Sequence, residues 1–176
     1  MSSLNKGLGK VEVTLKWDPS PLGEPDIDLD IIAGTYSAAD PYGDPVYLVH
    51  FDSRSPDGTI TLNRDSRTGQ GFGVDEAMTL EFERISEEYA RVVVGVAIQQ
   101  REERRTFGHV PHTAARISEG VNELAAYDFG DVAGATASTI AEFRRDEAGV
   151  WEFRENVRGF DEDPDAFGRL MGRRPV

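Results

Sequence analysis

The stretch RVVVGVAIQ, residues 91–99, is the segment that decides the fold. Its residues are apolar at odd and even positions alike, so a strand formed here would be apolar on both faces, as in a strand buried between layers. By contrast, VEVTLKW at residues 11–17 alternates apolar and polar residues, which is typical of a strand with one face in solvent. The difference between the two segments predicts two packed layers.

Similar short segments recur on both sides of this stretch, and glycine, proline, aspartate and serine separate them. We predict strands over residues 11–17, 27–32, 46–51, 59–62, 77–82, 91–99, 113–118, 123–128, 138–144 and 150–154. About ten short strands indicate a mainly all-β protein, an antiparallel β-sandwich with one or two short helices. One helical turn is expected at Ser86–Tyr89, because a capping serine there precedes acidic residues.

The length of 176 residues suits one domain, and no linker or repeat divides the chain. We expect the sandwich to occupy residues 1–160. Residues 161–176 are expected to form a C-terminal tail or docking helix, because Asp163 followed by Pro164 is a helix start signal.

The composition excludes several classes of function. With 32 acidic and 19 basic residues the net charge is −13, which disfavours binding to nucleic acid or to anionic lipid and favours cations as partners. The chain has no cysteine, which excludes disulfides, thiolate zinc sites and a cysteine nucleophile. Without a signal-like start or a long apolar run, the protein is expected to be cytoplasmic and not inserted into membranes.

The acidic segment PDIDLDI, residues 25–31, carries the first sign of a specific site. In a strand, Asp26, Asp28 and Asp30 would share one face, with neighbouring Cα atoms about 6.6 Å apart. Carboxylates in such a row raise one another's pKa and disfavour the strand unless cations compensate them. A hard divalent cation resolves this conflict, although a solvated face paired with arginines is the ordinary alternative.

A second oxygen-rich segment, RDSRTGQGFGVDE at residues 64–76, can complete such a site. Calcium takes about 6 to 8 oxygen ligands, more than one strand supplies. The segment offers carboxylates, hydroxyls and glycines that let the backbone turn its carbonyls inward, and it lacks the histidine and cysteine that zinc or copper prefers. An EF-hand is excluded, because the position that requires glycine holds Gln70.

The motifs DIDLD, DSRTGQGFGVDE, RRTFGHV, AAYDF and VWEF occur in the order seen in the tellurium-resistance TerD family, and together they resemble it over residues 26–153. The resemblance implies a β-sandwich that binds two calcium ions between the acidic strand and the glycine-rich loop. It also implies a role in bacterial stress responses to tellurite, phage and colicins, without catalytic activity. The metal-site positions that match the family are Asp26, Asp28, Asp30, Asp65, Thr68, Gly69, Gly71, Gly73, Asp75 and Glu76.

The loop departs from the family pattern at several positions. Phe72 and Val74 stand where the family usually has acids, and Gln70 also replaces an acid. Since calcium affinity follows the number and charge of its ligands, we predict one retained calcium site and a second that is weakened or lost. Alternatively, the guanidinium of Arg64 or Arg67 takes the place of one metal ion.

Three functions therefore follow from the sequence. The leading hypothesis is a non-enzymatic, calcium-binding adaptor or scaffold whose ordered rim contacts other stress-response proteins. The second is a degenerate family member without metal, which contacts partners through an edge strand or the tail. The third is a metal-dependent enzyme acting on phosphates or sugars, in which Asp28 and Asp30 hold the cation.

Overall fold

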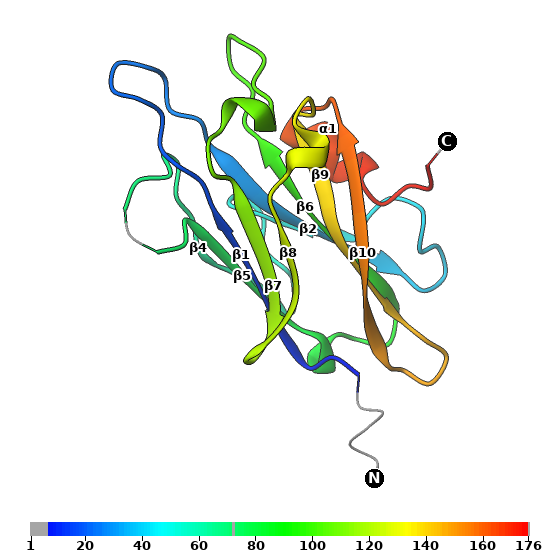
Figure 1. Ribbon diagram of the computed structural model, residues 1–176. Helices are drawn as coiled ribbons and strands as arrows, with labels where there is room; N and C mark the ends of the chain where they lie inside the picture. The colour runs from blue at the N-terminus through cyan, green and yellow to red at the C-terminus, as the bar shows by residue number, and fades with distance from the viewer. Residues whose placement is uncertain (1–6, 72, 176) are drawn as a thin grey trace.

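The computed structural model describes residues 7–71 and 73–175, and within them ten strands form two antiparallel sheets packed face to face (Figure 1). The predicted all-β sandwich is confirmed. The first sheet has the order β4 (Ile60–Arg64), β5 (Glu76–Glu81), β1 (Lys10–Lys16), β7 (Ala114–Glu119) and β8 (Asn122–Tyr127). The second has the order β10 (Trp151–Phe160), β9 (Ala137–Arg145), β6 (Tyr89–Ile98), β2 (Leu29–Ser37) and β3 (Tyr47–Val49).

The core lies between the sheets and follows the two sequence patterns. In β1, Val11, Val13 and Leu15 are buried, while the residues between them face away from the core. In β6 both faces are buried: Val92, Val94 and Val96 pack in the core between the sheets, while Val93 and Ala97 belong to a second apolar cluster. The strand predicted to lie between layers is therefore a central strand covered on both sides.

The second layer over β6 is the helix α1 (Pro164–Leu170), which contacts β2 and β6. Asp163 caps it, since its side chain accepts a hydrogen bond from the Ala166 N–H at 2.8 Å. Fully buried Phe167 occupies the space above Gly95, where any side chain would collide with its ring. The predicted helix start is confirmed, while the division of the chain at residue 160 stays a prediction.

The helical turn expected at Ser86–Tyr89 is wrong. The Tyr89 N–H donates to the Ser86 carbonyl at 3.1 Å in an ordinary turn that leads directly into β6, so the strand overrides the local helix signal. Short 3₁₀ helices occur instead at Phe82–Arg84 (η2), Phe107–His109 (η3) and Gly130–Val132 (η4). No described helix combines the length and apolar character that a membrane crossing requires.

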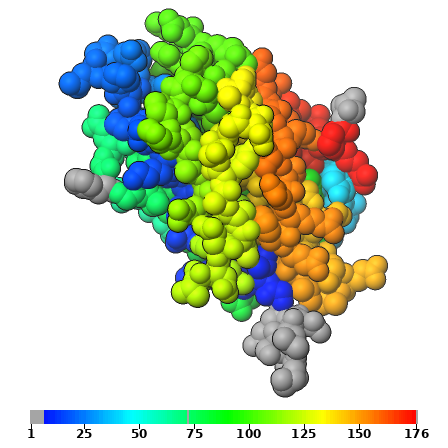
Figure 2. All heavy atoms as spheres, viewed as in Figure 1, coloured from blue at the N-terminus to red at the C-terminus, as the bar shows by residue number. Residues whose placement is uncertain are grey.

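The space-filling view shows β8 and β10 next to each other on one side of the molecule (Figure 2). Ala125 and Tyr127 of β8 and Glu155 and Val157 of β10 line the same small cavity. Side chains therefore close this side of the sandwich, although the two strands belong to different sheets.

Candidate metal centre

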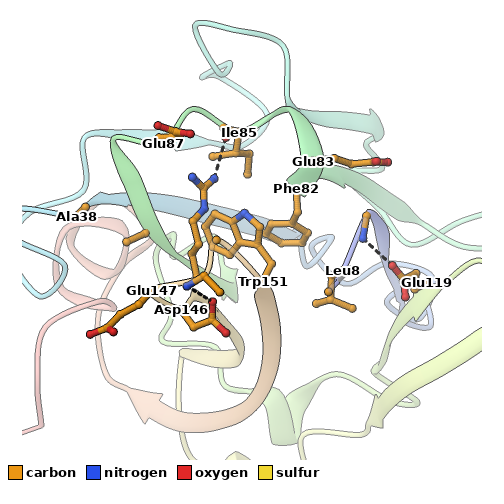
Figure 3. Close-up of a pocket in the computed structure, with 16 residues that line it drawn as sticks. Leu8, Ala38, Phe82, Glu83, Ile85, Glu87, Glu119, Asp146, Glu147 and Trp151 are labelled. Carbon is orange, nitrogen blue, oxygen red and sulfur yellow. Dashed lines mark hydrogen bonds between the residues drawn. The ribbon is translucent and has the colours of Figure 1, made fainter. Parts of the chain in front are cut away.

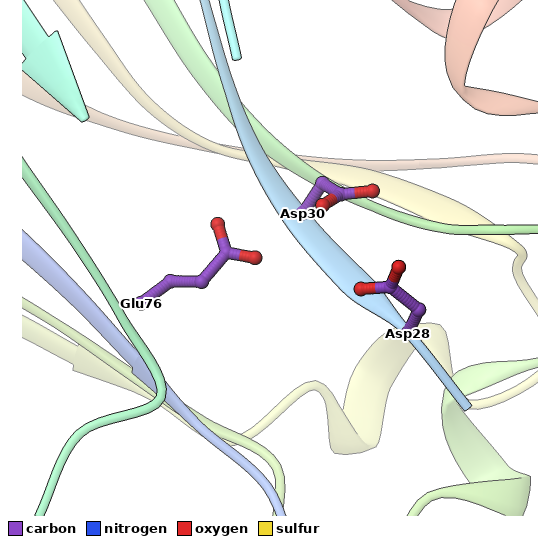
Figure 4. A group of neighbouring side chains, drawn as sticks. All are labelled: Asp28, Asp30 and Glu76. Atoms are coloured by element: carbon purple, nitrogen blue, oxygen red, sulfur yellow. The ribbon is translucent and has the colours of Figure 1, made fainter. Parts of the chain in front are cut away.

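Three carboxylates converge at one end of the sandwich, where the two sheets meet (Figure 4). Asp30 lies in β2, Asp28 directly precedes that strand, and Glu76 is the first residue of β5 in the other sheet. Their ligand oxygens all lie within 4.8 Å of one another. The Gln99 N–H donates to the Asp28 carbonyl at 2.8 Å, which extends the pairing of β2 with β6 and fixes the backbone at Asp28.

Hydrogen bonds satisfy only part of this cluster. One oxygen of Glu76 accepts the Ile31 N–H at 3.0 Å, and one oxygen of Asp30 accepts from the Gln99 side-chain amide at 2.6 Å. Within the described residues, Glu76 Oε2 and Asp28 Oδ1 are buried and have no hydrogen-bond partner. Since unpaired buried polar atoms are costly, these two oxygens are free to accept a hydrogen bond or to bind a cation.

The pKa values show that the chain alone does not stabilise three charges here. Burial raises the pKa of Glu76, which is 0% exposed, to about 10. Burial, followed by the charge of Asp30, raises the pKa of Asp28 to about 7, and burial raises that of Asp30 to about 6. Two like charges at this separation repel each other by on the order of 3 kcal/mol at an effective dielectric constant of 20. Charge on all three carboxylates at neutral pH is therefore unfavourable in the chain alone.

The donor set fits a hard metal ion. It consists of carboxylate oxygens, which calcium and magnesium prefer, without the nitrogen or sulfur ligands typical of zinc or copper. Within the described residues this is one group of acids close enough to share an ion. These three carboxylates can hold a metal ion.

The glycine-rich loop supports the acidic segment indirectly. Gly69, Gly71 and Gly73 have φ values of 76°, 106° and 82°, in the region that favours glycine. A Cβ at Gly69 would lie 2.5 Å from Nε1 of Trp17, and this nitrogen donates to the Ile27 carbonyl at 3.1 Å. The close approach at Gly69 thus lets Trp17 anchor the backbone between Asp26 and Asp28.

The other predicted ligands lie in different surroundings. Asp65 is exposed but lines the same cavity as Asp28 and Asp30, and its charge contributes to the raised pKa of both. Asp26 is exposed and outside the cluster, in the irregular segment before the backbone pairing that begins at Asp28. The expectation that three aspartates share one strand face therefore fails at Asp26.

Asp75 and Thr68 also lie outside the cluster. Asp75 is buried, but its Oδ2 accepts the Trp17 N–H at 2.8 Å, so it holds the end of β1 instead. Thr68 Oγ1 accepts the Gln70 N–H at 3.2 Å within the loop. Phe72, where the family usually has an acid, lies outside the described residues.

Four residues beside the cluster have no marked signal in the sequence. Gln99, Gln100, Arg101 and Phe51 join Asp28, Asp30, Asp65 and Arg67 around a cavity of about 260 Å³. Gln99 is brought there by the pairing of β6 with β2, which local sequence patterns do not reveal. Among the described residues, neither Arg64 nor Arg67 forms an ion pair with the cluster, so the structure gives no direct guanidinium replacement of a cation.

A larger cavity of about 930 Å³ lies at the opposite end of the sandwich (Figure 3). There Arg145 lies over the Trp151 ring and donates to the Ile85 carbonyl at 2.8 Å. Asp146 accepts the N–H groups of Ala148 and Val150 in the turn between β9 and β10. These contacts hold loops together, so the region has the character of a structural junction.

Comparison with known proteins shows the family of this chain. The TerD domain matches residues 1–167. The chain belongs to the TerD family. The tellurium resistance protein TerD of Alcaligenes sp is 30% identical over 165 residues, covering 91% of this chain and 85% of that protein. General stress protein 16U of Bacillus subtilis is 27% identical over 165 residues, covering 91% and 86%.

The TerD fold is also that of a solved structure with a much closer sequence. The crystal structure of a homologue of telluride resistance protein (TerD) from Streptomyces coelicolor A3(2) is 57% identical, with a TM-score of 0.94. The match covers 96% of this chain and 100% of that one. This TerD-family chain therefore has the sandwich of its relatives along nearly its whole length.

Proposed function

We propose that this chain is a non-enzymatic calcium-binding protein of the stress-response type, with one calcium site formed by Asp28, Asp30 and Glu76. The observation that supports the proposal best is the convergence of three carboxylates within 4.8 Å, two of them with buried, unpartnered oxygens. Exposed Asp65, which lines the adjoining cavity, is a further ligand in reach of the same site. The names of the relatives, tellurium resistance and general stress proteins, support the biological class.

The ion would connect the two sheets. Glu76 belongs to β5 and Asp30 to β2, so a cation shared by them ties the first sheet to the second at this rim. Binding to the folded form alone stabilises it by mass action. An ordered rim would then present a constant surface to other proteins, which is the adaptor or scaffold role that we propose.

The test is calcium titration by calorimetry together with thermal melting in calcium, in magnesium and in chelator. We expect about one calcium per chain and a melting temperature that rises with calcium concentration. Asp28→Asn with Asp30→Asn should remove both effects. Asp26→Asn is the matched control, because Asp26 belongs to the same acidic segment but lies outside the cluster. If wild-type protein shows neither heat nor stabilisation at millimolar calcium, the proposal is wrong.

A second candidate is an interaction module that works without metal. It is favoured by Arg67 and Arg101, whose positive charges lower the pKa of Asp28 and so compensate part of the acidic cluster. In that case the doubly substituted variant would keep its partner binding, and calcium would change the stability of neither the variant nor the wild type.

A further inference from the structure

The carboxylate cluster opens onto the cavity of about 260 Å³ described above. Glu76 and Asp30 each use one oxygen in a hydrogen bond, so three carboxylates provide fewer free oxygens than the six to eight that calcium takes. Asp28, Asp30 and Asp65 all line this cavity. The remaining coordination positions are therefore within reach of a molecule in the cavity.

Two arginines stand on the cavity wall beside these acids. Arg67 and Arg101 are exposed, and both line the same cavity as Asp28, Asp30 and Asp65. Within the part of the chain that the structure describes, neither guanidinium forms an ion pair. Guanidinium groups bind carboxylates and phosphates through paired hydrogen bonds, so these two are suited to an oxyanion at the metal.

The rest of the lining defines the size and polarity of a ligand. Phe51, a large apolar residue with 47% of its surface exposed, contributes to the wall and offers an aromatic face to an organic group. The cavity is slightly smaller than typical ligand pockets of about 300–1,000 Å³. A neighbouring cavity of about 630 Å³ shares Gln99 and Arg101 with it, so a larger ligand has room to extend from one cavity into the other.

We propose that this cavity binds a small organic oxyanion whose carboxylate or phosphate oxygens complete the calcium coordination and are held by Arg67 and Arg101. The inference rests on the proposed calcium site. The ligand is a soluble molecule, because a chain with a net charge of −13 is repelled by anionic membranes. Calcium and oxyanion then strengthen each other's binding by the same factor.

The test titrates calcium into the full chain with and without benzoate or phenyl phosphate, two probes that share a ring and differ in the anionic group. We expect either probe to tighten calcium binding by about 5-fold or more, within the usual range of coupling between sites. Ligand-observed NMR should show the probe bound in calcium and released by chelator. The probe that gives the larger effect identifies the preferred oxyanion.

Arginine variants test oxyanion binding separately from calcium binding. Arg67→Gln with Arg101→Gln should bind calcium alone at least as tightly as the wild type, because two positive charges are gone, but should lose the effect of the probes. Arg116→Gln, a matched change of an exposed arginine in β7, should keep it. An unchanged effect in the double variant overturns the inference.

The outcomes also distinguish the two proposals. Calcium binding without any effect of either probe overturns the oxyanion site and leaves the calcium site standing, whereas absence of calcium binding overturns both. Neutral benzamide serves as the charge control, and an effect equal to that of benzoate overturns the oxyanion assignment. Tighter calcium-dependent binding to phosphatidylserine vesicles than to either soluble probe overturns the assignment to a soluble ligand.

Discussion

Two buried glutamates of this sandwich have opposite electrostatic surroundings. Glu142 in β9 is 9% exposed and accepts a hydrogen bond from Arg91, which is 3% exposed, at 2.8 Å. Glu76 in β5 is 0% exposed and faces Asp28 and Asp30, with one backbone N–H as its hydrogen-bond donor. The chain supplies a cation to the first glutamate but not to the second. Burial alone therefore does not distinguish the two acids, whereas the presence or absence of an ion-pairing cation within the chain does.

The compensated glutamate belongs to a structural junction. Arg91 also donates to the Gly172 carbonyl at 2.6 Å and to the Pro41 carbonyl at 3.0 Å, and its guanidinium lies over the Tyr42 ring. It thus joins the centre of the second sheet to the segment after α1. Its two terminal nitrogens are used in contacts within the chain, while its Nε is buried without a hydrogen-bond partner.

The largest effect is expected from breaking the compensated pair. Arg91→Met removes the closer of the two cations beside Glu142 and leaves it only the longer contact with Arg144, at 3.6 Å. The change should lower the free energy of unfolding by up to about 3–5 kcal/mol in urea denaturation. Adding Glu142→Gln should recover part of this loss, because the uncompensated charge is removed. A loss below about 1 kcal/mol would show that Arg144 or water compensates the charge of Glu142 without Arg91.

At the uncompensated site, Glu76→Gln should lower the stability of the protein only when calcium is present. Because the pKa of Glu76 is raised to about 10, it carries a proton at neutral pH without metal, so the amide should change stability little in chelator. At a calcium concentration 100 times the dissociation constant, the wild type gains about 2.7 kcal/mol that the variant lacks. Thermal melting measures both conditions, with Glu12→Gln, a change at an exposed position of β1, as the control.

A pH series sharpens the same contrast. Burial raises the pKa of Asp28 to about 7 and that of Asp30 to about 6, so the metal-free folded chain binds more protons than the unfolded chain between about pH 4 and 7. Their stabilising contribution is complete below about pH 4 and is lost as the pH rises through 6 and 7. In chelator, the melting temperature of the wild type should fall by a few degrees as the pH rises from about 4 to 7, compared with that of the Asp28→Asn, Asp30→Asn variant.

Calcium should reverse this trend, because it binds the ionised carboxylates and releases their protons. The calcium-induced rise in melting temperature should therefore grow between pH 5 and 8. A calcium effect independent of pH would contradict the participation of these aspartates.

The smallest effect is expected at Asp26. Since this side chain is exposed and lies outside the cluster, Asp26→Asn should change stability by no more than about 0.5 kcal/mol. Calorimetry should find the calcium affinity of this variant close to that of the wild type. A large loss would restore the ligand role that the sequence pattern assigns to it.

The fold was predictable because its signals are local. Alternation in β1 and the continuous apolar run of β6 each follow from a few neighbouring residues, and both strands occur where expected. The turn at Ser86–Tyr89 was mispredicted for the same reason, since a local capping signal lost to the pairing of β6 with its neighbours. Local patterns give the elements, and pairing decides their ends.

The site was predictable only in part. Asp28 and Asp30 stand out as a pattern, but the choice between Asp75 and Glu76 depends on which of two adjacent residues faces the other sheet. Arg101 and Phe51 reach the cavity from loops distant in the sequence. The register between strands and the paths of loops carry this information, and neither appears in a short motif.

The hydrogen bond from the Ile31 N–H to Glu76 joins residues 45 positions apart, on different sheets. A folding chain brings these groups together only after the two sheets have docked, so the ion has no complete site to bind earlier. Interactions absent from the folding transition state slow unfolding without speeding folding. Calcium bound at the proposed site should therefore lengthen the lifetime of the native state and protect it from irreversible unfolding.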